Sequence, residues 1–251
     1  MFYLVSLGLK AEHLTVEAVK TIKKCRKVFF DSYTNYSTEE QLRELEKALK
    51  KKIIVLNRKD IEENFKPVLR DSKKQNIALL VLGNALTATT HVQLLLEAKR
   101  LGVKFSFIPG ISITDFLGKA GLDAYRFGRI TTIVAPKQNY SPESFYDVIE
   151  KNFFSNHHSL CLLEFDAEKN LVLGIPEAIK ILEEIEKKRN SGIIKNSLLI
   201  GLYAIASKKE KIIPANAEKL KKLRQGIFPQ CLIVCAKLTE KEREAVSELV
   251  E

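Results

Sequence analysis

An apolar run of strand length followed by a small polar loop constrains this chain more than any other stretch. Residues Ile77–Leu82 are continuously apolar, which is typical of a strand buried on both faces. The run stops at Gly83, and a loop rich in Thr leads to His91, after which apolar residues recur at helical spacing as far as Gly102. In open α/β sheets ligands bind in the crevice beyond such strands, so this loop is either a binding loop or an ordinary connection with Thr caps.

Strands and helices alternate through the first half of the chain. The predicted strands are residues 2–8, 28–30, 53–56, 77–82 and 103–108. Amphipathic helical stretches separate them, and such alternation indicates a mostly parallel sheet with right-handed crossovers. Pro109-Gly110 interrupts the pattern, so we expect a domain boundary there. The expected N-terminal α/β domain therefore spans residues 1–109.

The second half is also predicted to be α/β, with a mixed sheet. Its candidate strands are residues 130–134, 160–165, 197–206, 212–213 and 231–235. Residues 197–206 and 212–213 are close enough along the chain to pair as neighbours. Residues 176–189 form a strong amphipathic helix whose first turn accommodates Pro176. The expected C-terminal α/β domain spans residues 110–251.

The net charge of +10 raises the question of a polyanionic partner. The lysines occur in short groups spread along the chain, mostly near acidic residues, which favours a solvated surface over a nucleic-acid interface. Lys10 and Glu12 interrupt the apolar N-terminus too early for a signal peptide, and no apolar run has membrane-spanning length. We therefore expect a cytoplasmic protein with no membrane partner and with reduced, buried cysteines.

The sequence lacks the usual phosphate-loop, dinucleotide and zinc-protease motifs, and no His or Cys pair has metal-ligand spacing, so no metal is expected. His91 is either structural or part of the crevice. Three loops follow apolar strands of the first sheet and could converge: Gly8-Leu9, Gly83–Thr90 and Pro109–Ile113. They offer backbone groups, hydroxyls and one carboxamide. Such a cleft suits a neutral or zwitterionic cofactor and does not suit a triphosphate.

Several stretches together resemble the diphthine synthases, members of the tetrapyrrole-methylase superfamily. They are SLGL at 6–9, GNALTATTH at 83–91, PGISI at 109–113, AGLDAYRFGRITTI at 120–133 and FPQCLIVCAKLTEKE at 228–242. The likeness runs in order along nearly the whole chain. The combination of ATTH with the later YRFG is the most specific part of it.

The resemblance implies a tetrapyrrole-methylase-like fold of two α/β domains with the active-site cleft between them, usually as a homodimer. It implies S-adenosylmethionine as methyl donor and translation elongation factor 2 as substrate, the amino group of whose modified histidine is methylated on the way to diphthamide. Carried over by motif, the cofactor contacts are Leu9, Asn84, Thr87, Ser112, Ile113, Leu163, Ile205 and Gln230. No catalytic residue is assigned, because an amine attacking a sulfonium carbon mainly needs alignment and desolvation.

The sequence departs from the family pattern at positions implied to face the cofactor. Asn84-Ala85 stands where the family loop has Asp-Pro, and Ala204-Ile205-Ala206 stands where it has Arg-Ala-Gly. Phe228-Pro229-Gln230 and Cys235-Ala236 replace the family's Pro-Pro-His and Pro-Gly. Two alternatives to an active diphthine synthase therefore stay open. One is a superfamily methylase acting on RNA or a tetrapyrrole, and the other is a non-catalytic relative that binds the elongation factor.

Overall fold

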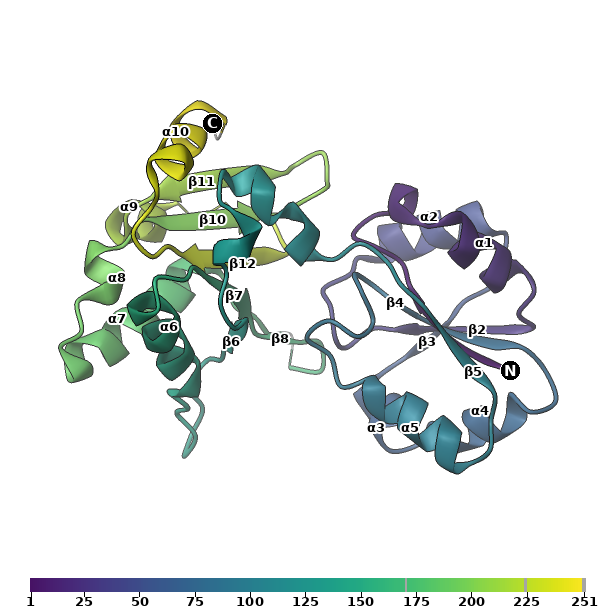
Figure 1. The fold of residues 1–251 in the computed structure, drawn as a ribbon. Coiled ribbons are helices and arrows are strands. Elements are labelled where there is room, and N and C mark those ends of the chain that lie inside the picture. Colours follow the sequence, from purple (N-terminus) through teal and green to yellow (C-terminus); the bar gives the residue numbers. More distant parts are fainter. Residues whose placement is uncertain (170, 224, 250–251) are drawn as a thin grey trace. The chain divides into compact units, whose positions relative to one another are not determined.

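The structure, a computed structural model, describes residues 1–169, 171–223 and 225–249. The chain divides into two compact units, Met1–Asp115 (unit 1) and Phe116–Glu251 (unit 2) (Figure 1). This division falls six residues after the boundary expected from Pro109-Gly110. The loop after residue 108 packs on unit 1, because a Cβ added to Gly110 would lie 2.7 Å from the Cβ of Ser6.

Unit 1 is built on a five-stranded sheet that is parallel throughout. In spatial order its strands are β3 (Ile54–Leu56), β2 (Lys27–Asp31), β4 (Ile77–Val81), β1 (Phe2–Ser6) and β5 (Phe105–Ile108). All five residues of β1 and all five of β4 are buried, which explains their unbroken apolar character. The parallel sheet predicted from the sequence is confirmed.

Helices cover both faces of this sheet (Figure 1). On one face α1 (Val16–Lys23) and α2 (Glu39–Leu49) pack against the strands. The other face is covered by α3 (Arg58–Glu62), α4 (Lys66–Asp71) and α5 (Val92–Arg100). Since α1 follows β1 and α5 follows β4, the chain leaves these neighbouring strands toward opposite faces. A topological switch point therefore lies at their carboxyl ends, where α/β sheets usually bind ligands.

A proline divides one stretch of helical sequence pattern in unit 1. The helical pattern over residues 60–75 corresponds to α3 and α4, and Pro67 lies in the first turn of α4. Proline lacks a backbone N–H and is tolerated only where that group has no intrahelical partner, so the residue starts a new helix.

Unit 2 contains a mixed five-stranded sheet, as predicted. Its strands, in spatial order, are β11 (Lys211–Ala215), β10 (Leu199–Tyr203), β12 (Gln230–Val234), β7 (Ser159–Leu163) and β6 (Thr131–Ile133). The pairing of β6 with β7 is parallel and the other pairings are antiparallel. A short hairpin, β8 (Phe165–Asp166) with β9 (Leu171–Val172), follows β7.

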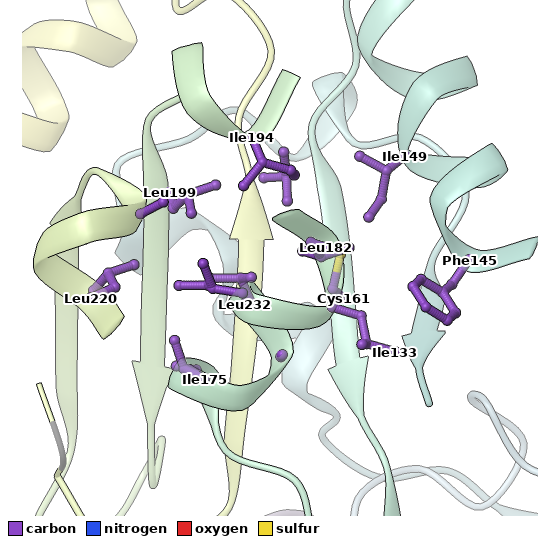
Figure 2. Packing of buried hydrophobic residues seen from close by; sticks show 14 of the residues in the cluster. Ile133, Phe145, Ile149, Cys161, Ile175, Leu182, Ile194, Leu199, Leu220 and Leu232 are labelled. Atoms are coloured by element: carbon purple, nitrogen blue, oxygen red, sulfur yellow. The ribbon is translucent and has the colours of Figure 1, made fainter. Parts of the chain in front are cut away.

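The core of unit 2 lies between this sheet and its helices. The helices are α6 (Ser144–Phe154), α7 (Ile175–Arg189), α8 (Ile193–Asn196), α9 (Ala217–Lys222) and α10 (Glu240–Leu249), and 3₁₀ turns span Ile113–Ala120 and Ala124–Arg126. The apolar stripe of α7, including Leu182, meets strand residues such as Cys161 and Leu232 (Figure 2). Within the described part of the chain, no helix has both the length and the apolar character needed to cross a membrane.

Candidate functional site

Two glycines join the loops that leave β1 and β4. The amide of Gly8 donates to the carbonyl oxygen of Gly83 at 3.1 Å, and the amide of Gly83 donates back to that of Gly8 at 2.9 Å. Both residues have positive φ, +73° and +71°. At Gly8 a Cβ would lie 2.3 Å from the Cβ of His13, so the packing of His13 against this turn requires glycine there. Leu9, which follows, donates its amide to Nδ1 of His13 at 3.2 Å.

Asn84 connects the β4 loop to the loop after β5. Its Nδ2 donates to the carbonyl oxygen of Gly110 at 3.2 Å, while its Oδ1 accepts the amide of Leu86 at 3.0 Å. The β1 strand is tied in as well, because Oγ of Ser6 accepts the amide of Ala85 at 3.0 Å. The structure thus brings together the three loops that the sequence singled out. The carboxamide of Asn84 links two of them, the loops after β4 and β5.

The other candidate residues of unit 1 lie on the same loops. Thr87 is half-buried, and its amide donates to the carbonyl oxygen of Asn84 at 3.0 Å. Ser112 is buried, and its amide donates to Oδ2 of Asp115 at 2.6 Å. Ile113 begins the 3₁₀ turn that follows. Backbone groups and small polar side chains dominate these loops, and the carboxylate of Asp115 lies at their border.

The candidate residues of unit 2 share one edge of its sheet. Gln230 begins β12 and pairs with Tyr203 at the end of β10, and Cys231 pairs with Leu162. Leu163 ends β7, and Ile205 follows β10 by two residues. These three positions, spread over residues 163 to 230, therefore lie at neighbouring strand ends.

The side chain of Gln230 is engaged within unit 2. Its Oε1 accepts the amide of Ile175, the first residue of α7, at 2.8 Å, and its Nε2 donates to the carbonyl oxygen of Ile227 at 2.9 Å. Gln230 is buried, so both ends of its carboxamide are satisfied away from solvent. The side-chain carboxamide of Gln230 therefore holds the start of α7 in place, a role that the sequence alone does not indicate.

The segment after β10 has an unusual backbone. Ala204 and Ala206 adopt φ values of +42° and +70°, in the left-handed region that favours glycine. The amide of Ala206 donates to Oε2 of Glu210 at 2.6 Å, and that of Ala204 donates to the carbonyl oxygen of Pro229 at 2.7 Å. Tertiary hydrogen bonds thus hold this conformation against the steric preference of alanine.

His91 lies in the interior of unit 1. Its ring is fully buried, and Nε2 is 2.9 Å from Oδ2 of the buried Asp31, the last residue of β2. Oδ1 of Asp31 also accepts the amides of Tyr33 and Thr34, at 2.8 and 3.2 Å. This arrangement ties the loop after β2 to the start of α5, so the structure favours the structural interpretation of His91.

The YRFG motif of unit 2 holds the terminal helix. Arg126 forms an ion pair with Glu242 of α10, and Nε2 of His158 lies 3.0 Å from the same carboxylate. Burial alone would raise the pKa of Glu242, but hydrogen bonds from Thr239, His158 and Asp123 lower it to about 2. Burial lowers the pKa of His158. Since the amide of Ala236 donates to Nδ1 of His158, the ring proton lies on Nε2, toward Glu242.

No group of three or more His, Cys, Asp or Glu side chains is placed to hold a metal ion among the described residues. A cavity of about 290 Å³ lies in unit 1 beside α3, α4 and α5, with Phe65 and Leu94 among its lining residues. It lies on the face covered by α3, α4 and α5, and of the three joined loops it reaches only Thr90, the last residue of one of them.

Comparisons with protein families, curated sequences and solved structures identify proteins that are similar to this chain. The family model described as Tetrapyrrole (Corrin/Porphyrin) Methylases matches residues 1–221. The chain is 35% identical to the diphthine synthase of Methanocaldococcus jannaschii, over 100% of this chain and 99% of that protein. It is 34% identical to the diphthine synthase of Staphylothermus marinus, over 94% and 89% of the two chains. A crystal structure of a diphthine synthase superposes with a TM-score of 0.87 at 28% identity, covering 99% of this chain and 95% of the other.

Proposed function

The chain belongs to the tetrapyrrole methylase family, within the group of the diphthine synthases, and from this premise we propose that it methylates translation elongation factor 2. The proposed acceptor is the amino group of the modified histidine that becomes diphthamide, and the proposed donor is S-adenosylmethionine. The observation that carries the proposal is the likeness to diphthine synthases over the full length of both chains.

The chemistry of the unit 1 loops fits this donor. S-adenosylmethionine supplies an electrophilic methyl group on a sulfonium, and its adenosine and zwitterionic amino-acid parts carry many hydrogen-bond donors and acceptors. The loops of Leu9, Asn84 and Ser112 offer mainly neutral polar groups at a switch point, where glycines allow close approach to the backbone. We propose that Leu9, Asn84, Thr87, Ser112 and Ile113 contact the cofactor from unit 1, and Leu163, Ile205 and Gln230 from unit 2.

The residues of the chain have a positioning role in this proposal. Asn84 holds the β4 and β5 loops at a fixed separation, which preorganises the backbone groups on both sides. Because the side-chain amide of Gln230 is engaged by Ile175 and Ile227, its contribution to the cofactor is its backbone. The attacking amine must be neutral, and its proton leaves to water or to a nearby acceptor.

We further propose that the protein acts in the cytoplasm as a homodimer. The assembly state is tested by sedimentation equilibrium of the full chain. A single species of dimer mass is expected, and a monomer at micromolar concentration would contradict this part of the proposal.

The experiment that tests the function is transfer of a labelled methyl group. Purified protein is incubated with labelled S-adenosylmethionine and an elongation factor 2 that carries the amino-carboxypropyl histidine. Label is expected in this protein and not in a control factor whose histidine is unmodified. Label in added RNA or a tetrapyrrole, or none with an active control enzyme, would contradict the proposal. Intact elongation-factor binding without cofactor binding would identify a non-catalytic relative.

A further inference from the structure

The charges of unit 1 are sharply separated along its sheet. Four segments lead into the amino ends of strands: residues 20–27, 47–53, 70–76 and 99–104. They contain 15 of the 20 lysines and arginines of unit 1 but only one of its 13 carboxylates, that of Asp71. We call these four segments the basic edge. The remainder of unit 1, which includes the three joined loops, has an excess of seven negative charges.

The cations of the basic edge face solvent. Fourteen of the 15 are exposed, and Lys51 is half-buried with its Nζ on the carbonyl oxygen of Cys25. Ion pairs to carboxylates among the described residues involve Lys27, with Asp71 at 2.7 Å, and Arg100, with Glu97 at 3.5 Å. Internal pairing therefore neutralises only a small part of the positive charge.

Helix dipoles explain part of this arrangement, but only a small part. The helices α1, α2, α4 and α5 end at the basic edge, and lysine or arginine occupies the last turn of each. A helix C-terminus carries about half a negative charge, so four helices account for roughly two of the 15 cations. The excess beyond this raises the repulsion among like charges and thus lowers the stability of the free protein. A bound polyanion would relieve that cost.

The cations also form a row. The segments enter β3, β2, β4 and β5, so they are distributed across the full width of the sheet, roughly 19 Å for five strands about 4.8 Å apart. From this juxtaposition we propose that the basic edge of unit 1 binds the phosphate backbone of RNA. The contact is electrostatic and does not read sequence, because lysine ammonium groups neutralise phosphates without specifying bases.

The composition of the edge favours RNA over a membrane surface. Amphipathic segments that bind membrane interfaces combine cations with large apolar side chains that insert beside them. Among the described residues, none of the exposed large hydrophobic side chains lies within the four segments, although Ile54 and Phe105 immediately follow two of them. The edge lies at the opposite ends of the strands from the three joined loops, so this inference does not depend on the proposed methyl transfer.

The test compares two fourfold variants of the full chain in RNA binding. The edge variant is Lys23→Glu, Lys52→Glu, Lys73→Glu and Lys104→Glu, with one change in each segment. The control variant is Lys208→Glu, Lys209→Glu, Lys219→Glu and Lys222→Glu, which makes the same change in net charge at exposed positions of unit 2. Binding of a labelled RNA hairpin is followed by fluorescence anisotropy across a salt series. Circular dichroism melting establishes that both variants are folded.

We expect the edge variant to weaken RNA binding at least about tenfold, and to reduce the slope of log K against log salt by up to about 3, since each phosphate contact contributes roughly 0.7–0.9. The control variant should change binding by less than about threefold if location matters more than net charge. Equal losses in both variants would overturn the proposal. So would an absence of RNA binding by the wild type, or edge-dependent binding to anionic lipid vesicles but not to RNA.

Discussion

Replacing Ala206 by glycine should stabilise the protein, which is unusual for a change that removes a half-buried methyl group. Ala206 has φ = +70°, and its amide is held by Glu210. A left-handed backbone costs a residue with a Cβ about 1–2 kcal/mol, and glycine avoids this cost. Glycine also has greater conformational freedom in the unfolded chain, and this offsets about 0.5–1 kcal/mol of that stabilisation.

The net expectation for Ala206→Gly is therefore a gain of about 0.5–1 kcal/mol in the free energy of unfolding. For a protein of this size that corresponds to a rise in Tm of about 1–4 °C, measurable by differential scanning calorimetry. Ala88→Gly, at φ = +56° in unit 1, should shift Tm in the same direction. Ala215→Gly is the control, because Ala215 lies within β11 and is buried, so its replacement should lower Tm. A fall in Tm for Ala206→Gly similar to that for Ala215→Gly would refute the reasoning.

Three further changes test the site and the scaffold. Asn84→Asp loses the Nδ2 donor to Gly110, which affects both ligands, and adds a carboxylate that attracts the sulfonium, a charge that only the donor carries. The ratio of S-adenosylmethionine to S-adenosylhomocysteine affinity should therefore rise. An unchanged ratio in calorimetric titrations would show that the side chain is remote from the sulfur. Asn84→Ala loses both hydrogen bonds, each worth about 1 kcal/mol, so it should lower Tm by several degrees. Because the loops are then no longer held together, S-adenosylhomocysteine binding should weaken about tenfold, and an unchanged affinity would argue against the linking role of Asn84. Because the folded-state pKa of Glu242 is lowered to about 2 from 4.5, its stabilisation is complete above pH 4.5 and is lost as pH falls toward 2. Glu242→Gln should therefore lower the unfolding free energy at pH 7 by about 3 kcal/mol. An unchanged urea midpoint would show that the contacts of Glu242 with Arg126 and His158 do not stabilise the fold.

The first sheet could be predicted from the sequence because its strands are buried on both faces. Ile77–Val81 is continuously apolar for that reason, and the parallel topology then requires the loops after β1, β4 and β5 to share one edge. Local residue types also define helix starts, as at Thr15, whose Oγ1 accepts the amide of Ala18 in the first turn of α1. These features depend on short-range pattern and on topology, which a single sequence contains.

Contacts between distant residues could not be predicted in this way. The partner of Gln230 is Ile175, 55 positions away, and no local pattern indicates that its carboxamide is used internally. His91 likewise meets Asp31 only because β2 and β4 are neighbours in the sheet.

The charge distribution gives the clearest example. Lysine groups such as those near residues 51 and 73 look dispersed along the chain, and the acidic residues near most groups predict a solvated surface. A parallel sheet gathers the segments before its strands at one edge, so the fold concentrates charges that the sequence separates.

Calorimetric titration of S-adenosylhomocysteine into the purified protein tests the central claim most directly, since it requires neither the elongation factor nor its modification. We expect saturable binding that Asn84→Ala weakens and that the lysine changes at the basic edge leave unaltered. A wild-type protein that releases or absorbs no binding heat at any temperature, and is not stabilised against thermal unfolding by the nucleoside, would contradict the account.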